Sequence, residues 1–180
     1  MTEPNPYKTP ESTRERPETL DNDGRDRLPV GLGGWLTLVA IGMVLAPLRL
    51  SVMILVTFVP LFQNGTWATL TTPGSEQYHP LWAPLLVFEI VGNLGFVAVY
   101  AVMIFLFFRK SRRFPQVYIA AALINLCFLA FDAWLCSFVL PDEPILDPDT
   151  TKEIVRSLAS TAIWVPYMLV SKRVKNTFVE

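Results

Sequence analysis

Four charged residues lie within long apolar stretches of the sequence: Arg49, Glu89, Asp132 and Arg156. A charge inside a membrane-spanning helix costs on the order of 3 kcal/mol, so such residues usually have a partner and often serve a function. At about 1.5 Å per residue, Glu89 and Asp132 both lie about 12 Å from the outer ends of their apolar stretches. Arg156 lies about 8 Å from the same side, and Arg49 lies near mid-membrane. We therefore predict that Arg156 pairs with Asp132 or Glu89, and that Arg49 approaches this group from below.

Two amides extend the group of charges. Asn93 follows Glu89 by four residues and therefore shares its helix face. Asn125 precedes Asp132 by seven residues, so both amides are expected a turn or two below the acids. The candidate intramembrane polar cluster consists of Arg49, Glu89, Asn93, Asn125, Asp132 and Arg156.

Three roles are open for this polar cluster. A buried ion-pair network could fix the register of the helices. The cluster, or the small-residue face at Gly92 and Gly95, could contact another membrane protein or a second copy of the chain. Acids at membrane depth also mark ion pathways, so Glu89 and Asp132 could couple proton movement to transport. Many transporters carry inverted repeats, and none is visible here.

No enzymatic activity is expected, because the sequence has no metal-ligand set, no nucleophile–base pair and no phosphate-binding loop. We assign no catalytic residue, no metal and no cofactor. The net charge of −1 and the lack of a basic face argue against a nucleic-acid partner. The expected function is that of a structural or accessory membrane subunit. The alternative is a small ion- or proton-coupled solute transporter that uses Glu89 and Asp132.

The composition favours an all-α membrane protein. Hydrophobic residues make up 52% of the chain and charged residues only 17%, and the apolar runs lack the regular polar stripe of a soluble amphipathic helix. The sequence predicts a four-transmembrane-helix bundle over residues 30–180. Residues 1–29 are rich in proline and charge, which predicts a disordered tail. The expected spans are 35–62, 81–108, 114–140 and 151–171.

The basic residues predict the orientation in the membrane. They gather at one end of the expected helices, whereas the loops at 63–80 and 141–150 contain no Lys or Arg. The positive-inside rule then places both termini in the cytoplasm, with the lipid bilayer as the principal partner. The candidate anchors, which could also contact anionic lipid, are Arg109, Lys110, Arg112, Arg113, Lys172, Arg173 and Lys175.

Several motifs resemble those of a known family. They are GLGGWL at residues 31–36, the helices that carry Glu89 and Asp132, and the closing stretch EIVRS…IWVPYMLVSKRVKNTF. Over roughly residues 30–180 the chain resembles the YdgK-like family of small bacterial inner-membrane proteins, a family of unknown function. The resemblance implies a bacterial cytoplasmic (inner) membrane and a four-helix membrane domain. It implies no activity.

Overall fold

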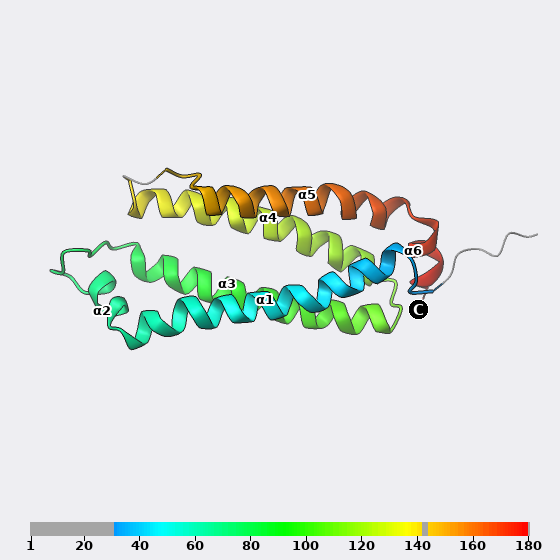
Figure 1. The fold of residues 1–180 in the computed structure, drawn as a ribbon, viewed down its shortest axis with the longest axis horizontal. Helices are drawn as coiled ribbons and strands as arrows, with labels where there is room; N and C mark the ends of the chain where they lie inside the picture. Colours follow the sequence, from blue (N-terminus) through cyan, green and yellow to red (C-terminus); the bar gives the residue numbers. More distant parts are fainter. Residues whose placement is uncertain (1–30, 142–143, 180) are drawn as a thin grey trace, which may run out of the picture.

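The structure is a computed structural model that describes residues 31–141 and 144–179. The predicted disordered tail, residues 1–29, lies outside these ranges. The described chain is helical, with four long helices and two short ones (Figure 1). They are α1 (Trp35–Gln63), α2 (Thr66–Thr71), α3 (Trp82–Phe108), α4 (Phe114–Val139), α5 (Pro148–Val170) and α6 (Lys172–Thr177).

Three helices in the described ranges are long and apolar enough to cross a membrane, namely α1, α3 and α4. They cover the first three expected spans. Helix α5 has 23 residues and is therefore about 35 Å long, but it does not share this apolar composition. Its first turns carry Lys152, Glu153 and Arg156, which make it amphipathic. The structure thus supports an all-helical membrane protein with three apolar spans, beside which α5 runs as a fourth long helix.

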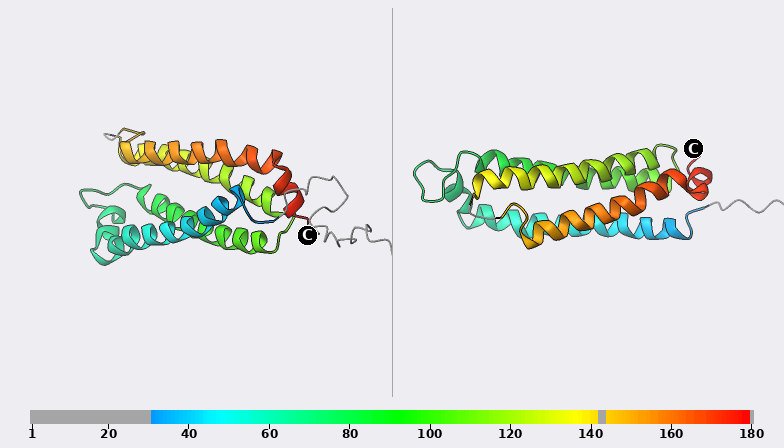
Figure 2. Two further views of the ribbon diagram at one scale, coloured as in Figure 1. Left: turned by 45° about the vertical axis from the view of Figure 1, so that its right-hand side comes forward. Right: turned by 90° about the horizontal axis from the view of Figure 1, so that it is seen from above.

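The long helices form two layers, α1 with α3 and α4 with α5 (Figure 1). Helix α3 also packs on α4 and joins the layers along one side of the molecule. On the other side, α1 and α5 touch through side chains, namely Trp35 with Trp164 at 6.3 Å between ring centroids and Arg49 with Glu153. Figure 2 shows this from above, with α3 and α4 along one side and α1 and α5 along the other. Helices α1 and α5 come together at the end that carries α6 and diverge toward the end that carries α2 (Figure 1). We call these ends the α6 end and the α2 end.

The main hydrophobic core lies at the α6 end. Phe107 and Phe114 are almost fully buried where α3 ends and α4 begins, and Phe178 stacks on Phe114 with ring centroids 4.6 Å apart. Aromatic pairs of this kind add about 0.5–1.5 kcal/mol beyond the area they bury. Leu36 from α1 and Met168 from α5 complete the packing, so all four long helices contribute to this core.

The glycine-rich entrance to α1 contacts α6. The backbone N–H of Gly31 donates to Thr177 Oγ1 at 3.0 Å, and Thr177 is 1% exposed. The Arg173 guanidinium lies against the next turn, where a Cβ on Gly33 or Gly34 would be 3.3 or 3.1 Å from Arg173 Nη1. A side chain at either glycine would have to displace the Arg173 guanidinium slightly, and the φ of 66° at Gly34 also favours glycine. The GLGGWL motif and the basic closing motif are parts of one contact.

The two short helices were not predicted. Helix α2 lies within the expected loop 63–80 and follows Gly65, whose φ of 74° is readily adopted only by glycine. Helix α6 continues the chain beyond α5 after a break at Ser171, whose backbone is extended. The Ser171 hydroxyl accepts a hydrogen bond from the Val174 N–H at 3.4 Å and caps the new helix.

Candidate functional site

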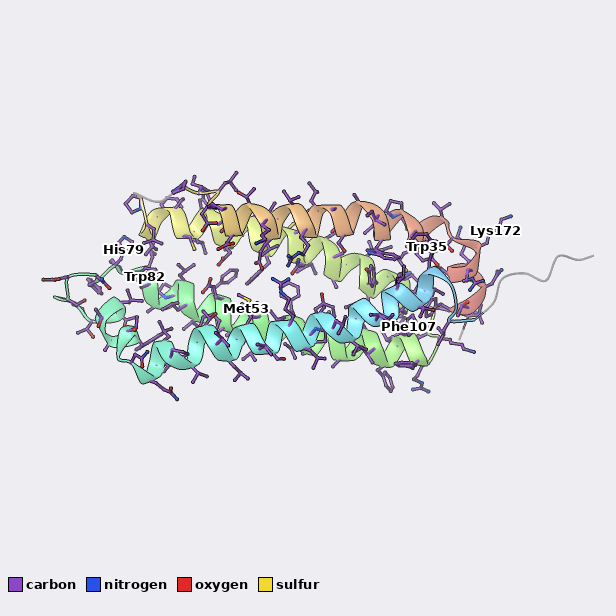
Figure 3. The ribbon with its side chains drawn as sticks, viewed as in Figure 1. Trp35, Met53, His79, Trp82, Phe107 and Lys172 are labelled. Atoms are coloured by element: carbon purple, nitrogen blue, oxygen red, sulfur yellow. The ribbon has the colours of Figure 1, made fainter. Side chains whose placement is uncertain are left out.

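A cavity of about 400 Å³ lies between the two layers and is lined by all four long helices. Met53, labelled in Figure 3, belongs to its α1 wall. The aromatic core around Phe107 and the ring of Trp164 lie toward its α6 end. All members of the predicted polar cluster line this one cavity: Arg49, Glu89, Asn93, Asn125, Asp132 and Arg156.

The contact between α3 and α4 sets the position of the two acids. Phe128 of α4 packs so closely on Gly92 of α3 that a Cβ at this glycine would overlap its ring. Phe88 stacks on Phe128 with ring centroids 4.8 Å apart and extends the contact by one turn. Glu89 precedes Gly92 by three residues and Asp132 follows Phe128 by four, so each acid lies one turn from this contact on its own helix.

The carboxyl groups of Glu89 and Asp132 face each other on the cavity wall, and we call them the acid pair. Asp132 Oδ1 is buried and has no hydrogen-bond donor in the described part of the chain. No Lys or Arg of residues 31–141 and 144–179 lies within 4.0 Å of either carboxylate. Asn93 does not bridge the pair, because its side-chain amide donates to the Glu89 carbonyl on its own helix at 2.8 Å.

The expected ion pair of Arg156 with Asp132 or Glu89 is wrong. Asn125 Nδ2 donates to Ser157 Oγ at 3.0 Å, which fixes the register of the antiparallel helices α4 and α5. Arg156 therefore lies about six residues, or ~9 Å, from Asp132 along the axis, on the α6 side. The sequence estimate assumed that α4 and α5 end at the same level. In the structure α5 begins at Pro148 beside the interior of α4, so each of its residues lies deeper than expected.

Arg49 also has a different partner from the one expected. Its Nη2 atom contacts Glu153 Oε1 at 2.7 Å, in an ion pair that joins α1 to α5 across the open side of the cavity. It does not contact the acid pair. Glu153 was not among the predicted site residues, although its charge compensates that of Arg49.

Helix α5 supplies a polar face to the cavity, of which the sequence predicted only Arg156. The cavity-lining residues of this helix recur every three or four positions: Glu153, Arg156, Ser157, Ser160, Thr161 and Trp164. This spacing is that of one face of an α-helix, so it was visible in the sequence. The mean hydropathy of residues 151–171 hides this face, because the apolar residues on the other side of the helix dominate the average.

The seven candidate anchors all lie at the α6 end, near the C-terminus of α3, the N-terminus of α4, or in α6. Arg112 Nε donates to the Val179 carbonyl at 2.5 Å. The Arg109 guanidinium lies 5.3 Å from the centre of the Phe105 ring. With Arg173 on the glycine entrance, at least three anchors have structural contacts in addition to any contact with lipid.

The chemistry of the cavity is that of charge and hydrogen bonding. Within the described part of the chain, no group of three or more His, Cys, Asp or Glu side chains is arranged to hold a metal ion. The cavity instead offers a carboxyl pair at one level, a guanidinium at another, and hydroxyl and amide groups on α3, α4 and α5. These groups can bind a polar solute and exchange protons.

Comparison with known proteins identifies the family. The profile of a family described as protein of unknown function (DUF2569) matches residues 29–179. The chain is 30% identical over 158 residues to inner membrane protein YdgK of Escherichia coli (strain K12). This match covers 84% of the chain and 95% of YdgK. No solved structure matches the chain. The chain belongs to the DUF2569 family, so the expected YdgK-like resemblance is confirmed. The apolar helices and this relative support a multi-pass protein of the cytoplasmic membrane.

Proposed function

We propose that this member of the DUF2569 family binds a polar solute or ion in its cavity and moves it across the membrane, with the acid pair as the proton-exchanging group. One observation carries the proposal: Glu89 and Asp132 face each other on the cavity wall with no basic side chain of the described chain within 4.0 Å. Acids placed in this way at membrane depth are typical of proton relays.

A purely structural role for the polar cluster is less consistent with these contacts. A network that fixes helix register should pair each buried charge, because an unpaired buried charge costs several kcal/mol. Of the predicted cluster charges, only Arg49 forms an ion pair within the described chain, and that pair is largely exposed. The half-buried acid pair lines the cavity without a basic partner, which suits groups that meet a solute.

The proposal includes an orientation and a fourth span. Helix α5 crosses the membrane beside α4 with its polar face on the cavity, where protein and solvent rather than lipid surround the charges. In this proposal the α6 end, and with it both termini, faces the cytoplasm, which is the orientation that the positive-inside rule favours for the basic residues at that end. On that side the cavity lining continues into the core cluster through Met43, Met103 and Trp164. No covalent chemistry is involved, so the protein acts without enzymatic activity.

Charge movement in reconstituted membranes tests the role of the acid pair. Proteoliposomes adsorbed on a solid-supported electrode are exposed to a rapid pH drop, and the transient current is recorded. We expect a transient for the unmodified chain that is largely lost in Glu89→Gln and in Asp132→Asn. Glu76→Gln is the matched control, because Glu76 is an exposed acid in the loop before α3. Equal currents from all four proteins would exclude proton exchange at the acid pair.

A role as an accessory subunit is the second candidate, and a different surface favours it. An apolar groove lies on the outer face of α3 and α4, and Gly95 opens onto it with no neighbouring atom within 4 Å of an added Cβ. Small residues at such a position let another helix approach closely. Gly92, in contrast, is already occupied by Phe128 of the same chain. Co-purification from native membranes in mild detergent tests this role, and Gly95→Leu should release any partner bound there.

A further inference from the structure

Two groups of opposite charge lie at different levels of the cavity, and neither is neutralised within the described part of the chain. The acid pair lies nearer the α2 end, and the backbone of Arg156, whose side chain lines the same cavity, lies about 9 Å closer to the α6 end along the helix axes. Arg49 does not neutralise the acids, because it is held by Glu153. The cavity therefore has a negative region and a positive region along its length.

A ligand must suit both regions to bind well. A simple cation would leave the guanidinium without a partner, and a simple anion would meet the acid pair. A protonated amine can donate to the carboxyl groups, including the buried Asp132 Oδ1 that has no donor. A carboxylate can accept two parallel hydrogen bonds from the fork of Arg156. One molecule that carries both groups therefore satisfies both regions.

The rest of the lining is consistent with a small molecule. A cavity of about 400 Å³ is at the lower end of the range of small-ligand sites. The Asn125–Ser157 hydrogen bond lies near the level of Arg156. The hydroxyl groups of Ser160 and Thr161, one turn further along α5, can donate to the same carboxylate as Arg156. Phe128 and Leu129 of α4 line the cavity between Asn125 and Asp132, so an aliphatic segment can contact this wall.

We propose that the cavity binds a small zwitterion whose amine contacts Glu89 and Asp132 and whose carboxylate contacts Arg156. This inference rests on the proposed function, because it names the class of solute that the same cavity would carry. It makes Arg156, which has no role in proton exchange, a determinant of solute specificity.

Calorimetry on the full chain in lipid nanodiscs tests the proposal with matched ligands. The probes are the linear amino acids glycine, γ-aminobutyrate and ε-aminocaproate. The best binder of these is then compared with its methyl ester, which lacks the carboxylate, and with its N-acetyl derivative, which lacks the amine. We expect at least one amino acid to bind, and each derivative to bind roughly tenfold more weakly or worse, because one charge-assisted interaction is lost.

Two variants test which residue contacts the carboxylate of the ligand and which contacts its amine. In Arg156→Gln the amino acid should bind no better than its methyl ester, while the preference over the N-acetyl derivative remains. In Asp132→Asn the preference over the N-acetyl derivative should fall, while that over the ester remains. Glu76→Gln should leave both preferences unchanged. Failure of all three amino acids to bind, or equal binding of the parent and both derivatives, would overturn the zwitterion site.

The outcomes separate this inference from the proposed function. Suppose that the pH-driven current depends on the acid pair, but the amino acid, its methyl ester and its N-acetyl derivative bind equally well. This result would support proton exchange and reject the zwitterion site. Suppose instead that Arg156→Gln removes the preference over the ester and Asp132→Asn that over the N-acetyl derivative, but no pH-driven current is recorded. This result would support the zwitterion site and reject proton-coupled transport.

Discussion

The α6 end and the cavity half of the bundle are held together in different ways. At the α6 end, Phe107, Phe114 and Phe178 fill the space between the layers, and Thr177 ties α6 to the entrance of α1. In the cavity half, α3 and α4 remain in contact through Gly92 and Phe128, whereas α1 and α5 diverge and are joined by the ion pair of Arg49 with Glu153. Aromatic packing thus dominates one end, whereas the other end holds the polar groups of the cavity.

This difference matters because apolar surface gives little drive to helix association in lipid. Lipid tails are as apolar as the helix surfaces, so close packing and hydrogen bonds must hold the helices together. Both are concentrated at the α6 end and at the contact of Gly92 with Phe128. Substitutions there should change stability, whereas substitutions on the cavity wall should change function with a smaller effect on stability.

The largest effect is expected from Phe114→Ala. Phe114 is 0% exposed and contacts Phe107, Tyr118 and Phe178, so its loss leaves a cavity at the centre of the α6 end. We expect a loss of about 3–5 kcal/mol, as for other buried Phe→Ala changes, measured by unfolding in detergent. Phe138→Ala is the control, because Phe138 is half-exposed on α4. Equal losses in the two variants would show that the α6 end is not the main source of stability.

Gly92→Val should have the next largest effect. The new side chain would overlap the Phe128 ring, and overpacking of this kind costs about 1–3 kcal/mol. It should also push α3 from α4 and separate the acid pair, so the pH-driven current should fall. Gly95→Val is a close control, since it adds the same side chain one turn away where the space is open. If both variants are equally stable, the Gly92–Phe128 contact does not position the acids.

A smaller effect is expected from breaking the Arg49–Glu153 pair. The side chains are 61% and 37% exposed, and exposed pairs contribute about 0.2–1 kcal/mol. Arg49→Gln and Glu153→Gln should therefore each lower the midpoint of thermal unfolding slightly, and the double variant should be no less stable than either. Lys152→Gln, which removes only the weaker contact to Asp149 at 3.9 Å, is the control. Additive losses in the double variant would mean that the two charges act independently.

The sequence predicted the helices better than their contacts. Long apolar runs were sufficient to locate α1, α3 and α4, because each such helix needs only lipid around it. The depth of Arg156 was not predictable in this way, since it depends on where the chain turns between α4 and α5. Helix α6, which begins after the expected span 151–171, was also missed, because helix propensity alone does not reveal that α6 turns to meet Gly31.

The turn before α5 provides a pH dependence, and this pH-dependent part is the smallest predicted effect. The Asp147 carboxylate accepts a hydrogen bond from the Thr150 N–H at 2.5 Å, and this bond holds the pKa of Asp147 below its usual value. A carboxyl group whose pKa is lowered in the folded state stabilises that state above its unfolded pKa of about 4. The contribution is then lost as the pH falls through the lower, folded value.

Asp147→Ala should therefore lower stability slightly at neutral pH, and the difference from the unmodified chain should shrink as the solution is made acidic. Asp147→Asn keeps a side chain that can cap the helix and should remove only the pH-dependent part. Thermal unfolding over a series of pH values measures both effects. Because this cap sets where α5 begins, a shift of its start would also change the level of Arg156. A variant that loses the cap yet retains discrimination between a zwitterion and its ester would show that packing along α4, rather than the cap, fixes that level.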